Sequence, residues 1–259
     1  METETILSAA EAVEYGEFKR TRREAEVALT LKKMIVDASR RETDKHALRV
    51  ACETAKKIHA FGVLVSPVNV AAARRHLSES EIAVICLVGG TGESLPAIKR
   101  QEAKRAMRMG AREIRLVLCY SALTGGNLAY LKREAKRVKK AVKKCALLLS
   151  LEDHSLGSDD IAFGTRVALE SGVDGVCVRG ETELLGRVLT ACGDRLRADV
   201  SEIENAEQLR LLMKAGAAHA TSGQSEKVAE ELYRAAEAGA EIVRAIRPEP
   251  TAKPTEVPI

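Results

Sequence analysis

Helical segments alternate with short apolar segments along most of this chain, and a glycine often stands where one gives way to the other. Four such glycines, Gly62, Gly110, Gly172 and Gly216, each end a helical run and precede a strand-like one. Glycine just past a helix end is the usual left-handed C-cap. Strands that alternate with helical patterns are typical of parallel β-α-β units. The chain is therefore restricted to a parallel α/β architecture.

The alternation predicts eight strands, each followed by a helix. The predicted strands are 34–37, 63–66, 82–88, 113–119, 146–151, 175–178, 196–200 and 218–221. The predicted helices are 43–60, 68–77, 95–109, 126–144, 158–171, 182–191, 205–215 and 225–245. Eight such units fit a closed (β/α)8 TIM barrel, in which reactive groups lie at the C-terminal ends of the strands. An open doubly wound sheet is the alternative, but its usual GxGxxG turn is missing after the first strand, where the chain reads DASRRET.

Three regions are expected along the chain. Residues 1–31 are predicted to form an N-terminal helical extension, and residues 32–246 the barrel. Residues 247–259 hold four of the six prolines and show no apolar periodicity, so we expect a disordered tail.

The composition narrows the compartment and the classes of partner. The six cysteines are scattered without a CxxC pair, which favours a reducing compartment and gives no reason to expect a metal site or another cofactor. No apolar run has the length of a signal peptide or a membrane helix, so we expect a soluble, cytoplasmic protein with no membrane partner. The net charge of +4 is too small by itself to imply nucleic acid.

Six segments form a pattern when they are taken in order. They are IVDAS (35–39), VLVSPVNV (63–70), IKRQEAKRAMRMGAREI (98–114), YSALTGGN (120–127), SLED (150–153) and NAEQLRLLMKAGA (205–217). Together they resemble strand ends and helices of the deoxyribose-phosphate aldolase family, over residues 35–223. The resemblance implies a (β/α)8 barrel and, as the ancestral chemistry, a class I aldolase reaction.

The positions that carry chemistry in this family depart from its pattern. The resemblance implies a Schiff-base lysine on strand six, where this chain has Cys177, and a second lysine on strand seven, where it has Ala198. Arg115 stands at the family's proton-transfer aspartate, and Leu148 at a further lysine. Neither cysteine nor alanine can form an imine with a carbonyl compound. We therefore expect no catalytic residue of the aldolase type, although the chain's status as an enzyme stays open.

The predicted strand ends still bring together a set of polar side chains. The pocket candidates are Asp37, Ser66, Arg115, Glu152, Cys177, Arg179, Thr221 and Ser222. By strand alternation Arg115 points into the barrel and needs a carboxylate partner, for which Glu152 and Asp37 are candidates. A structural ion pair is favoured over an anion-recognition pocket. For Cys177, a small core residue is favoured over a nucleophile activated by Arg179.

Other features have plain interpretations that we favour. His154 is expected to be an exposed rim residue, and the loop GGTGES (89–94) a tight strand-to-helix connection. The helix 126–144 carries eight basic residues, interpreted as a solvated face rather than a site for nucleic acid or an acidic partner.

Two functional hypotheses follow, together with a weaker third. In the first, the barrel has lost Schiff-base chemistry and acts through binding or assembly, as a homo-oligomer (a dimer, by the family resemblance) or through a protein partner at residues 1–31. In the second, a re-tooled enzyme acts on a small anionic or phosphosugar substrate around Arg115, Glu152, Cys177 and Arg179. In the third, residual aldolase activity uses an amine not located in the sequence.

Overall fold

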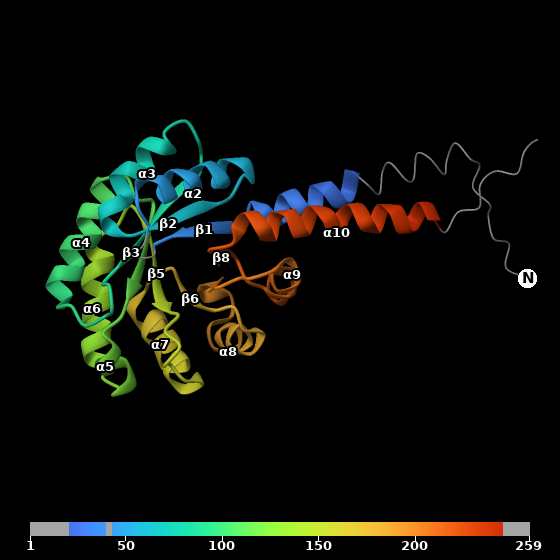
Figure 1. Ribbon diagram of the computed structural model, residues 1–259. Coiled ribbons are helices and arrows are strands. Elements are labelled where there is room, and N and C mark those ends of the chain that lie inside the picture. Colours follow the sequence, from blue (N-terminus) through green and yellow to red (C-terminus); the bar gives the residue numbers. More distant parts are fainter. Residues whose placement is uncertain (1–20, 40–42, 246–259) are drawn as a thin grey trace, which may run out of the picture.

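The strands close into a single parallel barrel (Figure 1), which confirms the predicted fold class. The structure is a computed structural model that describes residues 21–39 and 43–245. The strands are β1 Met34–Ala38, β2 Gly62–Val65, β3 Ala83–Val88, β4 Glu113–Val117, β5 Ala146–Leu151, β6 Gly175–Arg179, β7 Arg197–Ser201 and β8 Ala220–Ser222. Each strand pairs with the next in the chain, and β8 pairs with β1. Closure removes every sheet edge.

A helix follows each strand and covers the outside of the barrel. The helices are α2 Lys45–Lys57, α3 Val70–His76, α4 Pro96–Arg108, α5 Tyr120–Thr124, α6 Leu128–Ala141, α7 Ser158–Ser171, α8 Thr182–Cys192, α9 Ala206–Ala215 and α10 Ser225–Ala245, with short 3-10 turns at Pro67–Asn69 and Gly193–Arg195. Residues 21–31 are also helical and lie beside α10 (Figure 1). The rest of the predicted extension, and the predicted tail 247–259, lie outside the described residues.

Local capping explains where the observed elements differ from the predicted ones. The helix expected from Thr43 begins later, because the carboxylate of Asp44 caps it by accepting from Ala47 N–H at 2.7 Å. The strand expected to reach residue 119 ends at Val117, because Cys119 N–H donates to Glu134 Oε2 at 3.1 Å instead of to a neighbouring strand. The chain then forms the short helix α5, which the sequence pattern did not predict.

The glycine junctions are mostly as expected. Gly110, Gly172 and Gly216 have φ angles of 110°, 66° and 111°, the left-handed conformation of a helix C-cap. Gly62 is different, because it is the first residue of β2. A Cβ at this position would stand 2.8 Å from the carbonyl oxygen of Ala83. Glycine is required there by close strand packing rather than by a cap.

The barrel interior is divided into an apolar half and a polar half. A small apolar cluster fills the side lined by β1, β2 and β3 and contains Ile35, Leu64, Ala83 and Ile85. Buried polar side chains fill the side lined by β4 to β8: Glu113, Arg115, Ser150, Arg179, Asp199, Ser201 and Thr221. The main apolar core lies outside, between strands and helices. Any chemistry inside the barrel therefore belongs to the β4–β8 side.

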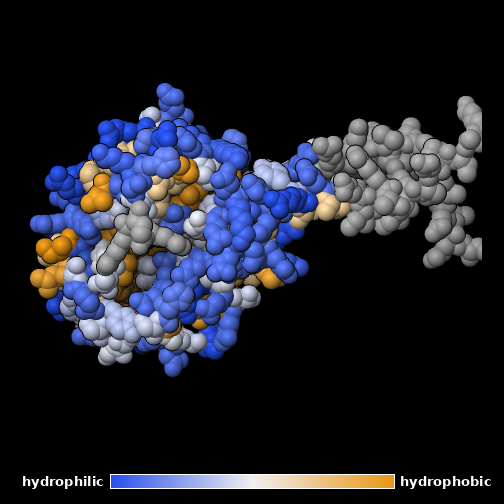
Figure 2. Space-filling model, viewed as in Figure 1, coloured by the Kyte–Doolittle hydropathy of each residue, from blue (hydrophilic) through white to orange (hydrophobic). Residues whose placement is uncertain are grey.

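The outer surface is mainly hydrophilic on the face drawn in Figure 2, with hydrophobic residues in scattered groups. Within the described residues, no helix combines the length and the apolar character that crossing a membrane requires.

Candidate functional site

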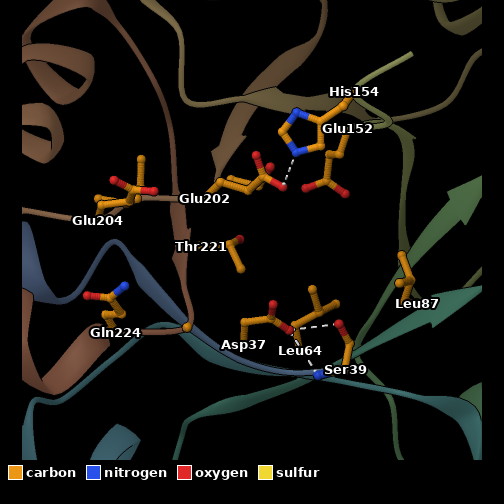
Figure 3. A pocket seen from close by; sticks show the side chains of 13 residues that line it. Asp37, Ser39, Leu64, Leu87, Glu152, His154, Glu202, Glu204, Thr221 and Gln224 are labelled. Atoms are coloured by element: carbon orange, nitrogen blue, oxygen red, sulfur yellow. Dashed lines mark hydrogen bonds and ion pairs between the residues drawn. The ribbon is translucent and has the colours of Figure 1, made fainter. Parts of the chain in front are cut away.

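A pocket of about 500 Å³ opens at the C-terminal ends of the strands (Figure 3). This is the end at which barrels of this architecture carry their reactive groups. The lining residues are Asp37, Ser39, Leu64, Leu87, Glu152, His154, Ser201, Glu202, Ile203, Glu204, Thr221, Gly223 and Gln224. They come from the ends of β1, β2, β3, β5, β7 and β8 or from the loops that follow these strands.

The lining of this pocket is acidic. Four carboxylates contribute, Asp37, Glu152, Glu202 and Glu204, and among the residues that the structure describes no lysine or arginine lines the pocket. The ring Nε2 of His154 lies 3.0 Å from Glu202 Oε1, so the loops after β5 and β7 meet at the mouth (Figure 3). Negative charge at the mouth opposes a phosphate group and favours a neutral or cationic one.

One lining residue has an unusual backbone. Glu202 has φ of 60°, in the left-handed region that a residue with a Cβ rarely adopts. The backbone thus has a conformation usual for glycine, although the residue is a glutamate. The local strain costs on the order of 1 kcal/mol.

Arg115 lies directly beneath the pocket and is completely buried. Its Nη1 donates to Thr221 Oγ1 at 2.8 Å and to Cys177 Sγ at 3.2 Å. Its Nη2 donates to Asp199 Oδ2 at 3.1 Å. The guanidinium therefore joins β4 to β6, β7 and β8 across the interior and fills the space below the pocket.

Further carboxylates surround the same guanidinium. Glu152 Oε1 lies 3.8 Å from Nη1 of Arg115, and Glu113 Oε1 lies 3.6 Å from Nε. The expected pairing with Glu152 is thus present, but the shortest of these ion pairs is with Asp199, which the sequence interpretation did not consider. A buried cation needs such partners, because desolvation otherwise disfavours its charge.

The charge network continues toward the opposite end of the barrel. Arg197 Nη2 contacts Asp199 Oδ2 at 3.0 Å and Glu113 Oε2 at 2.5 Å. His219 Nδ1 lies 3.2 Å from Asp199 Oδ1. Burial acts to raise the pKa of Asp199, but the hydrogen bond from His219 and the charges of Arg115 and Arg197 outweigh it and lower that pKa overall. Asp199 is therefore an anion held at the centre of the network.

The thiol at the strand-six position is not set up for nucleophilic attack. Cys177 is fully buried and donates to Glu152 Oε1 at 3.0 Å. Burial raises the pKa of Cys177 well above that of a free thiol, and the opposing effect of Arg115 does not compensate. The side chain is a neutral thiol that packs against the guanidinium.

The remaining sequence candidates are distributed around the pocket rather than gathered in it. Asp37, Glu152 and Thr221 line it, whereas Ser66, Arg115, Cys177, Arg179 and Ser222 do not. Arg179 pairs with Glu181 at 2.8 Å and donates to the carbonyl of Asp153 at 2.6 Å, which fixes the loop after β5. The Ser222 hydroxyl donates to the carbonyl of Ile203 at 2.5 Å, and that of Ser66 accepts from Asn69 at 3.3 Å.

Ala198, which the sequence analysis matched to the family's second lysine, faces away from the barrel interior. Ala198 packs in the core between strands and helices. Arg197 and Asp199, its neighbours, point inward and join the charge network. The inward group of β7 at the level of Cys177 is therefore the carboxylate of Asp199.

Sequence reasoning missed one buried amine. Lys99, in α4, is fully buried, and its Nζ lies 2.7 Å from Glu134 Oε1 and donates to the carbonyl of Val117 at 2.9 Å. It sits between α4, α6 and the end of β4, and it does not line the pocket. Its place in the IKRQEA segment was the available signal, but the segment was used only for its resemblance. Across the described part of the chain, no group of three or more His, Cys, Asp or Glu side chains is arranged to hold a metal ion.

Comparisons with known proteins point to one family. Deoxyribose-phosphate aldolases from Treponema denticola and Exiguobacterium sibiricum are 32% and 28% identical to this chain over 135 and 139 residues, about half of its length. The one from Mycoplasmoides pirum is 28% identical over 204 residues, which cover 74% of this chain and 92% of that protein. The chain is thus similar to deoxyribose-phosphate aldolases in sequence. The resemblance expected from the six segments is thereby confirmed.

Solved structures of deoxyribose-phosphate aldolases share the fold of this chain. A putative enzyme of this name from Coccidioides immitis superposes with a TM-score of 0.74 at 22% identity, covering 85% of this chain and 97% of that one. The tetrameric enzyme from Aeropyrum pernix superposes with a TM-score of 0.73 at 15% identity, covering 88% and 99%. The chain spans 63%, 62% and 58% of the length of the first curated aldolases it matches. No protein-family model matches it.

Proposed function

We propose that this member of the deoxyribose-phosphate aldolase family has lost Schiff-base chemistry and acts by binding. One observation carries the proposal. A buried guanidinium and a neutral thiol, Arg115 and Cys177, occupy the interior below the pocket, where an imine-forming amine would have to stand. Within residues 21–39 and 43–245, no lysine lies on the eight strands or lines the pocket.

The chemistry of arginine supports this proposal. A Schiff-base amine must be partly neutral near pH 7, which another cation or burial achieves for a lysine. A guanidinium stays protonated in proteins and offers only hydrogen-bond donors. Arg115 uses those donors in hydrogen bonds to Asp199, Thr221 and Cys177, so it links the strands across the barrel interior.

The pocket is the place where such a protein would bind a small molecule. With four carboxylates in its lining, we propose a neutral or cationic polar ligand in place of a phosphosugar. A re-tooled enzyme acting on a small anion is the second candidate. It is favoured only by Gly223 and Gln224, which line the pocket at the start of α10, where backbone N–H groups attract anions.

The assembly of the chain is a further part of the proposal. The Aeropyrum pernix aldolase is described as a unique tetramer. We propose that this chain also forms a homo-oligomer.

Borohydride trapping tests the loss of imine chemistry. The protein is incubated with deoxyribose 5-phosphate, or with acetaldehyde, then reduced and digested for mass spectrometry. An active family member gives the positive control. We expect no stoichiometric adduct on any lysine. A full adduct at one lysine would refute the proposal, and the Lys99→Met variant would show at once whether the buried amine of α4 is the one responsible.

Thermal-shift measurements test the binding role separately. Polyols and amines are expected to raise the melting temperature of the wild type, and Glu152→Gln is expected to reduce the effect of the amines. Shifts produced only by phosphorylated sugars would favour the second candidate.

A further inference from the structure

The outer wall of the barrel carries a hollow between α4 and α6, two helices that lie side by side in Figure 1. Its volume is about 520 Å³, and it is lined by Ala97, Arg100, Lys104, Arg137, Lys140 and Ala141. The lining thus has four cationic side chains and two alanines, with no carboxylate. The hollow is formed by the flanks of helices, and it shares no lining residue with the acidic pocket at the strand ends.

The four cations are not neutralised by the protein. Among the described residues, none of Arg100, Lys104, Arg137 and Lys140 has an ion pair or a side-chain hydrogen bond. Further basic side chains without such partners continue this surface along the same two helices and the residues that follow α6: Arg105, Arg108, Arg133, Lys136, Lys143 and Lys144. We call these ten residues the basic face.

The carboxylates of the two helices are occupied elsewhere. Glu134 is fully buried against Lys99. Glu102 accepts a hydrogen bond from Gly89 N–H at 2.8 Å. On the other flank of α6, Lys132 and Lys139 do have partners, Glu170 and Asp174. The helix therefore pairs the charges that face α7 and leaves those of the basic face unpaired.

The spacing of these cations is unfavourable in the free protein. Arg100 and Lys104 stand four residues apart on α4, as do Arg133 and Arg137 on α6. Side chains at this spacing are neighbours on a helix surface, where like charges repel. A solvated face needs only scattered charges of both signs, as in the exposed i,i+4 pairs Arg187–Glu183 and Arg166–Glu170. Uncompensated repulsion is relieved when an extended polyanion binds.

We propose that the basic face binds the phosphate backbone of duplex nucleic acid. The helix α6 has 14 residues, so it is about 21 Å long. Duplex DNA carries one negative charge per about 1.7 Å of axis, both strands counted, so a duplex segment as long as this helix carries about a dozen phosphates. Phosphate contacts position a protein without reading sequence, and lysine and arginine supply most of them.

The composition of the face decides between kinds of polyanion. The hollow has no aromatic side chain on which a base could stack, so a single strand gains nothing over a duplex. It also has no large apolar side chain to anchor a protein partner, and the energetic centres of protein interfaces are usually aromatic, arginine-rich and poor in lysine. Charge is the only recognition element that the hollow offers.

A binding titration with a matched variant tests this proposal. A labelled duplex DNA of about 20 base pairs is titrated at salt concentrations from about 50 to about 200 mM. One variant reverses the hollow: Arg100→Glu, Lys104→Glu, Arg137→Glu and Lys140→Glu. The control variant reverses four exposed cations elsewhere: Lys32→Glu, Lys45→Glu, Arg210→Glu and Lys214→Glu. Each substitution replaces one positive charge by one negative charge, so the four together change the formal net charge of either variant from +4 to −4.

We expect the wild-type affinity to fall steeply with salt, and the hollow variant to bind at least about tenfold more weakly, with a shallower salt dependence. The control variant should stay within about threefold of the wild type, since its changes lie outside the face. Equal losses in both variants would overturn the proposal, because net charge alone would then explain binding. Tighter binding of poly-glutamate or of a single-stranded oligonucleotide would also overturn it. Circular dichroism of both variants is the control that checks whether they are folded.

Discussion

Replacing Arg115 by methionine isolates the contribution of the buried charge network to stability. The substitution keeps a side chain of similar length and removes every donor of the guanidinium. Asp199, which is fully buried, loses its contact at 3.1 Å, and Thr221 and Cys177 lose the donor that they share. Buried carboxylates left with fewer cations are the main source of the expected loss.

The size of the effect follows from what remains around Asp199. Removing one partner of a buried ion pair usually costs about 3–5 kcal/mol. Arg197 at 3.0 Å and His219 at 3.2 Å still contact Asp199 in the variant, so we expect the lower end, about 3 kcal/mol. In a protein of this size 1 kcal/mol shifts the melting temperature by about 2–4 °C, so the expected decrease is about 6–12 °C.

Urea and thermal unfolding measure this loss, and Arg112→Met is the matched control. Arg112 is exposed, and its side chain donates a single hydrogen bond, to the carbonyl of Glu81 at 3.1 Å. Its replacement should therefore lower the free energy of unfolding by less than about 1 kcal/mol. The folded state lowers the pKa of Asp199 below its ordinary 3.8, so this carboxylate contributes stability above that pH and loses it as the pH falls through the folded pKa. The difference between wild type and Arg115→Met should therefore persist down to about pH 4 and narrow only at lower pH, as Asp199 of the wild type is protonated. Equal stability of the two proteins at pH 7 would refute the argument.

Three further outcomes follow from the same structure. Ellman's reagent should leave Cys177 unmodified in the native protein at pH 8 and modify it in guanidinium chloride, since burial raises the pKa of this thiol and closes access to it. Gly92→Ala should destabilise the protein by at least about 2 kcal/mol more than Gly90→Ala in urea unfolding, because its Cβ would stand 2.2 Å from a backbone oxygen, whereas the Cβ at Gly90 meets open space. Lys99→Met should cost about 3–5 kcal/mol by the same assay, and adding Glu134→Gln should recover much of it because the remaining side chain is neutral; no recovery would contradict this account.

The sequence predicted the barrel because the signals that specify it are local. Periodicity of the apolar residues separates strands from helices, and Gly110, Gly172 and Gly216 mark three of the junctions. Eight repeats of one unit leave few arrangements, since parallel strands with helical crossovers all turn in the same sense. Boundaries were less certain, because caps such as Asp44 and Asn127 are chosen by geometry that several neighbouring residues could satisfy.

The contents of the interior could be predicted only in part. Strand alternation placed Arg115 inside, and its need for a carboxylate identified Glu152 as a partner. The shorter ion pair, between Arg115 and Asp199, depends on the register between β6 and β7. In that register Cys177 stands opposite Asp199. A shift of one residue along a strand exchanges the side chains that face inward and those that face outward. The resemblance to the family matched its second lysine to Ala198, which faces the helices. Register is a tertiary property, and no local pattern encodes it.

Lys99 is the residue that bears most directly on the proposed loss of aldolase chemistry, because within the described residues it is the one lysine that is buried near the strand ends. Its Nζ is held by protein partners: Glu134 Oε1 lies 2.7 Å from it, and the carbonyl of Val117 accepts a hydrogen bond from it at 2.9 Å. Glu134 is in turn held by Cys119 N–H, so α4, α6 and the end of β4 are joined through one ammonium group. Lys99 has these partners and does not line the pocket, so its role is to stabilise the rim of the barrel. The interior below the pocket is occupied by Arg115.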